Sequence, residues 1–81
     1  MRRQNNEGHA YALFDEFGNA WGWYTSVDEA LSNIRALVDR GDEADASVMK
    51  LLVFTDEQST LLLTGSALIA AAAHAPVLTV A

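Results

Sequence analysis

The 81-residue sequence predicts a small α+β domain of order ββαββα, a mainly antiparallel sheet with one long amphipathic helix and one short alanine-rich helix. Two runs of strand-forming residues flank a short turn, an apolar run with helical character follows, and the same succession then occurs a second time. A chain of this length supports one modest core. We therefore expect a single domain over residues 9–81 and a disordered tail over residues 1–8.

The first hairpin is predicted by two aromatic-rich runs, His9 to Phe14 and Ala20 to Thr25. Between them lies Asp15-Glu-Phe-Gly-Asn19, where Gly and Asn accept the positive φ that turns need. We favour a five-residue loop; a four-residue loop would mix the two faces. The five-residue loop places Tyr11, Leu13, Trp21 and Trp23 on a helix-covered face, and Phe14, Ala20, Gly22 and Tyr24 on the other.

A capping box predicts where the long helix begins. The hydroxyl of Ser26 is placed to accept from the Glu29 amide, and the Glu29 carboxylate to accept from the Ser26 amide. Apolar residues then recur at helical spacing as far as Val38, and Gly41 ends the helix. We expect replacement of Ser26 to destabilise the domain and replacement of Ser32, on the same helix, to have little effect.

The second half of the sequence predicts the same order of elements and contains fewer charged residues. The acidic segment from Asp42 to Asp45 predicts a solvated loop, and Ser66 is predicted to cap a short helix from Ala67 to about His74. The predicted strands are Val48 to Thr55, Thr60 to Thr64 and, at an edge of the sheet, Val77 to Val80. The likeness of Leu13-Phe-Asp-Glu16 to Phe54-Thr-Asp-Glu57 fits either a duplicated unit or two similar turns that arose independently.

The segment Gly22-Trp-Tyr-Thr-Ser-Val-Asp-Glu-Ala30 resembles a junction found in small ββα modules such as the hybrid-binding domain of some eukaryotic ribonucleases H. The shared pattern is Gly-x-Tyr-x-Ser-x-x-Glu-Ala/Cys, and the resemblance implies a capped strand-to-helix junction. In that family, basic and polar residues around the junction contact nucleic-acid backbones. This chain has no Lys or Arg between Arg3 and Arg35, so nucleic-acid binding does not carry over.

Charge and composition argue against several classes of partner. The net charge of −6 leads us to expect neither direct nucleic-acid binding nor attraction to an anionic membrane. The first residues lack the apolar stretch of a secretory signal, and the absence of cysteine fits a reducing cytoplasm. The uncharged segment from Gln58 to Ala81 fits a buried strand and helix or a membrane anchor; its polar residues and Pro76 favour the former.

Residues with catalytic or metal-binding chemistry are sparse. His9 and His74 stand alone, with no partner at metal-ligand spacing. Solvation and the helix dipole explain the acidic pairs, which are Asp15-Glu16, Asp28-Glu29, Asp42-Glu43 and Asp56-Glu57. We therefore predict no catalytic, metal-binding or cofactor-binding residues, and a protein that is not an enzyme.

One face of the predicted sheet is apolar and has no second long helix to cover it. Its large residues are Phe14, Tyr24, Leu52, Phe54 and Leu62. Such a face usually marks an interface, although the short helix or curling of the sheet would also bury it. We favour a non-catalytic protein-interaction module that homo-oligomerises through this face. The alternative is an acidic inhibitor that occupies a basic, nucleic-acid-binding surface of another protein; a small-molecule or enzymatic role is a third hypothesis.

Overall fold

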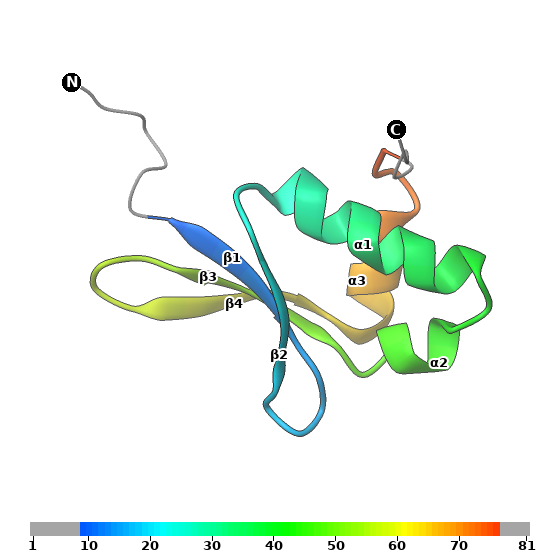
Figure 1. The fold of residues 1–81 in the computed structure, drawn as a ribbon, viewed down its shortest axis with the longest axis horizontal. Helices are drawn as coiled ribbons and strands as arrows, with labels where there is room; N and C mark the ends of the chain where they lie inside the picture. The colour runs from blue at the N-terminus through cyan, green and yellow to red at the C-terminus, as the bar shows by residue number, and fades with distance from the viewer. Residues whose placement is uncertain (1–8, 77–81) are drawn as a thin grey trace.

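The computed structural model describes residues 9–76, which form an antiparallel sheet packed against helices (Figure 1). Its order confirms the predicted ββαββα plan, with one additional single-turn helix. The elements are β1 (Ala10–Phe14), β2 (Ala20–Tyr24), α1 (Val27–Asp39), α2 (Glu43–Ala46), β3 (Lys50–Phe54), β4 (Ser59–Thr64) and α3 (Gly65–Ala72). The tail predicted over residues 1–8 and the strand predicted from Val77 to Val80 lie outside the described residues.

The four strands lie in the order β2-β1-β3-β4, and every neighbouring pair is antiparallel. Two hairpins therefore meet through their first strands, β1 and β3. Exchanging the two hairpins leaves this order unchanged, which is the symmetry that a duplicated ββα unit would have. The loop between β3 and β4 projects away from the helices (Figure 1).

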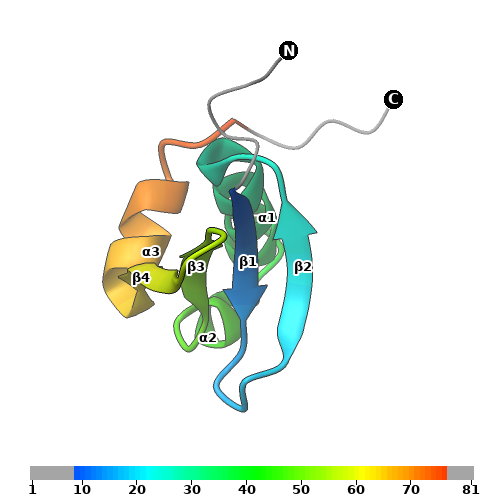
Figure 2. The same cartoon turned by 90° about the vertical axis from the view of Figure 1, so that its left-hand side faces the viewer.

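Both longer helices pack on the same face of the sheet (Figures 1 and 2). One core cluster joins Leu13 and Leu51 of the central strands with Ile34 of α1 and Leu68 of α3, and none of these four is more than 1% exposed. The short alanine-rich helix thus lies beside α1, and no helix within residues 9–76 covers the opposite face of the sheet. Helix α3 therefore does not cover that face.

Helix α1 is capped at both ends. Ser26 Oγ accepts from the Glu29 amide at 3.1 Å, as predicted, but the Glu29 carboxylate accepts from the amide and hydroxyl of Thr25 instead of from the Ser26 amide. At the other end Gly41, with φ 95°, donates to the Val38 carbonyl, and the next amide donates to Leu37. This pair of bonds is a Schellman motif, which satisfies carbonyls that the helix leaves free.

Side chains of α1 also donate hydrogen bonds to backbone carbonyls of the segment that follows α3. Ser32 is buried and its hydroxyl donates to the Pro76 carbonyl at 2.7 Å, while Arg35 Nη1 donates to the carbonyls of Ala73 at 3.5 Å and Ala75 at 2.6 Å. Carbonyls at a helix C-terminus lack partners within the helix, so these bonds hold α3 against α1. The burial of Ser32 and its bond to a partner 44 residues away in the chain remove the basis for expecting that its replacement has little effect.

Two local predictions in the second half are corrected. Residues 43–46 form the helix α2 instead of a solvated loop, because Ala46 is fully buried in the core and its amide donates to Asp42. Helix α3 begins at Gly65, ahead of the predicted start at Ala67, and Ser66 is not its N-cap. The N-cap is Thr64, whose hydroxyl donates to the Met49 carbonyl.

Within residues 9–76, no helix combines the length and the hydropathy needed to cross a membrane.

Candidate interaction surface

The first hairpin has the predicted five-residue loop but carries a β-bulge beside it. Phe14 pairs with Ala20 and Leu13 with Gly22, so Trp21 is an extra residue in β2. The loop is closed by the Asp15 amide, which donates to the Asn19 carbonyl at 2.9 Å. The Asp15 carboxylate accepts from the amides of Asn19 and Phe17, which hold the pKa of this carboxyl below its ordinary value.

The bulge reverses part of the predicted assignment of faces. Tyr24 pairs with Tyr11 and so lies on the helix-covered face, where both tyrosines pack against the core. Its partial burial, and secondarily the nearby Glu29 charge, raise the pKa of the Tyr24 hydroxyl. Trp23 pairs with Ala12 and lies on the opposite face with Phe14. The prediction that Tyr24 shares a face with Phe14 was therefore wrong, and Trp23 takes that place.

A second bulge lies in β4. Leu51 pairs with Leu63 and Leu52 with Leu61, so Leu62 is the extra residue. Leu61 consequently shares the uncovered face with Leu52. Leu62, which the sequence placed on this face, lies at the bulge and is 40% exposed.

We call the uncovered side of the sheet the open face. Its large apolar residues come from all four strands and are Phe14, Trp23, Leu52, Phe54 and Leu61. Three of them, Phe14, Leu52 and Phe54, are among the residues predicted from the sequence. Trp23 and Leu61 were missed, because a single extra residue in β2 or β4 inverts the alternation of side chains beyond it.

The aromatic rings of the open face meet above the central strand β1. The ring centroids of Trp23 and Phe54 lie 5.1 Å apart, although their strands are separated by β1, and two strand spacings measure about 9.6 Å. Both rings therefore lean over β1, which has only alanine at positions 10 and 12. Ala12 is 0% exposed although none of the described helices covers this side, and Phe14 adds a third ring, 6.3 Å from Trp23.

Solvent still reaches much of this surface. Trp23 is 57% exposed and Leu61 is 50% exposed, whereas Phe14, Leu52 and Phe54 are partly buried. Phe14, Trp23 and Phe54 thus form an aromatic cluster, in which the rings pack against one another and the outer surface is apolar. Large aromatic side chains in such positions supply most of the binding energy of protein interfaces.

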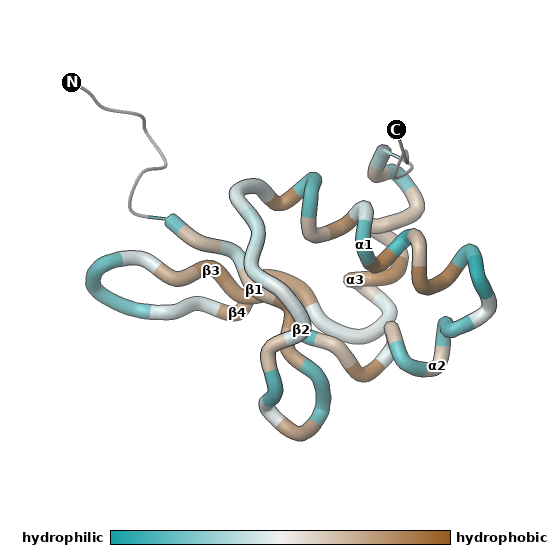
Figure 3. The backbone as a smooth tube through the Cα atoms, in the orientation of Figure 1, coloured by the Kyte–Doolittle hydropathy of each residue, from teal (hydrophilic) through white to brown (hydrophobic). Residues whose placement is uncertain are grey.

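Charged groups lie at the two ends of β3, beyond the aromatic cluster. Lys50 is exposed at the first residue of β3, and Asp56 and Glu57 are exposed in the loop that follows it. Figure 3 shows this loop as a hydrophilic segment at the end of two largely hydrophobic strands. His9 lies beside the same loop.

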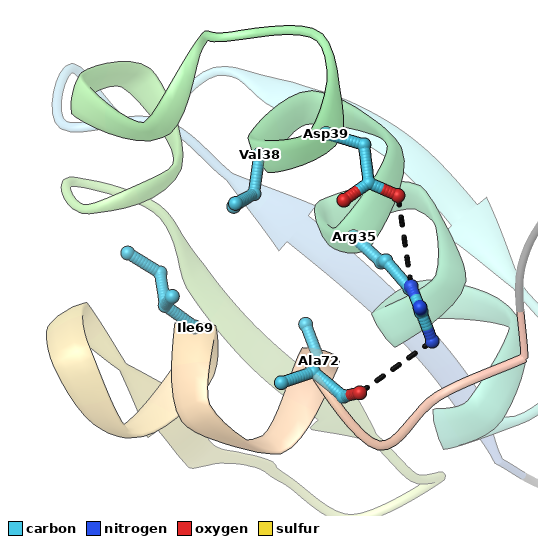
Figure 4. A pocket seen from close by; sticks show the side chains of 6 residues that line it. Arg35, Val38, Asp39, Ile69 and Ala72 are labelled. Atoms are coloured by element: carbon cyan, nitrogen blue, oxygen red, sulfur yellow. Dashed lines mark hydrogen bonds and ion pairs between the residues drawn. The ribbon is translucent and has the colours of Figure 1, made fainter.

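A small groove of about 150 Å³ with a mostly apolar lining lies between α1 and α3 (Figure 4). Val38, Ile69 and Ala72 line it, and Arg35 lies at its side. The Arg35 guanidinium pairs with Asp39 of the same helix at 3.6 Å, and its Nη1 donates to two carbonyls beyond α3, which ties α1 to the chain that follows α3. We interpret this groove as part of the helix packing.

The two histidines belong to different parts of the fold. His9 lies at the start of the sheet and His74 follows α3, and no three His, Asp or Glu side chains within residues 9–76 gather at metal-binding distances. No protein-family model matches the chain, and no curated protein or solved structure is significantly similar to it.

Proposed function

We propose that this protein is a non-catalytic interaction module that pairs with a second copy of itself through the open face. One observation supports this proposal above all. The helices that form the core lie on one side of the sheet, and they leave Trp23, Phe54 and their neighbours uncovered. A contiguous apolar surface on a small domain is characteristic of protein interfaces.

Pairing through faces is favoured over pairing through edges. The edge strands are β2 and β4, and each contains one of the two bulges. A bulge interrupts the row of free backbone donors and acceptors and twists the strand, which protects an edge from adding another strand. The open face has no such protection. A two-fold arrangement of two copies buries the same surface on each, and it closes after two subunits.

The size of the open face sets the expected strength of the dimer. Four strands of about five residues cover a projected area of roughly 300 Å², from about 4.8 Å between strands and 3.3 Å per residue. A standard interface buries about 800 Å² on each partner. We therefore expect a small, aromatic-centred interface and a dissociation constant in the micromolar range.

Replacing Leu52 by Glu tests this function. The charge would enter the interface of the dimer but remain on the surface of the monomer, because Leu52 lies outside the core cluster. We expect Leu52→Glu to sediment as a folded monomer at concentrations where the wild type is dimeric. Val48→Glu is the matched control, since Val48 is also partly exposed, at 38%, but lies outside the strands. It should remain dimeric.

Two results would reject the proposal. The first is a wild-type chain that sediments as a monomer at high micromolar concentration, which would favour the acidic-inhibitor hypothesis. The second is a Leu52→Glu variant that dimerises as tightly as the wild type, with an unchanged circular dichroism spectrum.

A further inference from the structure

Lys50 is the one charged residue in the four strands, and it is positioned beside the open face. It follows from the pairing of Lys50 with Phe14 and Thr64 that its side chain lies on the same side as Phe14. Lys50 is exposed, and no ion pair of Lys50 occurs among the described residues. It forms a cationic boundary at one end of an apolar surface.

The opposite end of the same strand has an acidic boundary. The loop after β3 is ordered by Thr55, whose hydroxyl oxygen accepts from the amides of Glu57 and Gln58 at 3.3 and 3.2 Å. A backbone bond from the Thr55 amide to the Gln58 carbonyl closes the turn. Asp56 and Glu57 are exposed there, and neither forms an ion pair with another described residue.

We propose that two copies pack face to face with their strands running in opposite directions, so that Lys50 of each copy meets Asp56 and Glu57 of the other. The inference rests on the proposed dimer. A two-fold axis perpendicular to the strands brings each cationic end over an acidic end. An axis parallel to the strands brings the two lysines together and gathers four carboxylates at the other end, and such like-charge contacts oppose association.

The geometry permits these contacts. Packed sheets lie about 10 Å apart, a separation that a lysine and a glutamate side chain bridge together. The carboxylates nearest to Lys50 along the sheet, Asp15 and Glu16, belong to the loop after β1. Asp15 is bonded to amides of its own loop, and Glu16 would face Lys50 of the other copy only in the parallel alignment.

Charge reversal tests the alignment. Lys50→Glu should raise the dissociation constant of the dimer between about threefold and thirtyfold, because two symmetric pairs are lost. Adding Glu57→Lys should restore it to within about threefold of the wild-type value. The matched control is Lys50→Glu with Glu43→Lys, which has the same net charge but places the new lysine on α2, in the helix layer and away from the open face; it should give no recovery. Sedimentation equilibrium measures all four proteins, and thermal unfolding shows that each is folded.

Three outcomes are distinguishable. Recovery with Glu57→Lys alone supports the antiparallel alignment. Equal recovery with Glu43→Lys, or a dimer that is indifferent to Lys50→Glu, overturns the alignment while the dimer itself stands. A monomeric wild type instead overturns the proposed function on which the alignment depends.

Discussion

The side chain of Tyr24 folds over Gly22, two residues earlier on the same face of β2. A methyl group at position 22 would collide with the hydroxyl oxygen of Tyr24 and would lie 2.7 Å from Cζ of its ring. The absence of a side chain at Gly22 therefore lets Tyr24 pack against the core. This packing also explains why the helix-covered face accommodates a tyrosine on the edge strand.

We predict that Gly22→Ala destabilises the domain by about 1–3 kcal/mol, the usual cost of forcing an extra methyl group into a packed site. In a Tyr24→Ala background the same change should be neutral or stabilising, because the ring is gone and alanine lowers the entropy of the unfolded chain. Urea unfolding of the four proteins measures the coupling. Equal effects of Gly22→Ala in both backgrounds would contradict the contact.

The hydroxyl of Ser26 provides a partner for a free amide at the start of α1. We predict that Ser26→Ala lowers the free energy of unfolding by about 0.5–2 kcal/mol, the usual value of an N-cap. Ser66→Ala is the control, because Ser66 is exposed in the first turn of α3 but is not its cap. Thermal or urea unfolding compares the two, and equal losses of stability would remove the capping role of Ser26.

At the scale of elements, local chemistry was enough to predict the first hairpin, the amphipathic α1 and its glycine end. These features depend on residues within a few positions of one another. Ser32 and Thr64 show where such reasoning stops, because their hydroxyls bond to carbonyls brought near only by the fold. The helix α2 was missed for the same reason: burial of Ala46 against distant elements favours a helix in a segment that is acidic enough to suggest a loop.

The bulges explain why the residues of the open face were only partly predicted. Alternation along β1 and β3 correctly places Phe14, Leu52 and Phe54 on one face. One extra residue in β2 exchanges the faces of Tyr24 and Trp23, and one in β4 brings Leu61 to the open face. In β2 the interior Gly22, beside the extra Trp21, is a residue type that often marks a bulge, whereas no residue type in β4 signals one; the position of each bulge becomes visible only when the pairing between strands is known.

At the scale of the whole molecule, the domain has two layers, with the helices on one side of the sheet and the open face on the other. Its two tryptophans report on these two sides separately. Trp21 faces α1, beside Asn33 and Ala36, and is 50% exposed; Trp23 lies on the open face and is 57% exposed. They are close in sequence and similar in exposure, so each is a control for the other.

Acrylamide quenching of single-tryptophan variants at rising protein concentration tests the central claim most directly. In Trp21→Phe, where Trp23 is the remaining tryptophan, dimerisation through the open face should lower the quenching constant and shift the emission to shorter wavelength as the concentration increases. In Trp23→Phe, where Trp21 remains, sedimentation first establishes that the dimer persists, and the quenching constant should then stay unchanged. If Trp23 stays equally accessible over the concentration range in which Trp21→Phe becomes dimeric, the open face is not the contact surface.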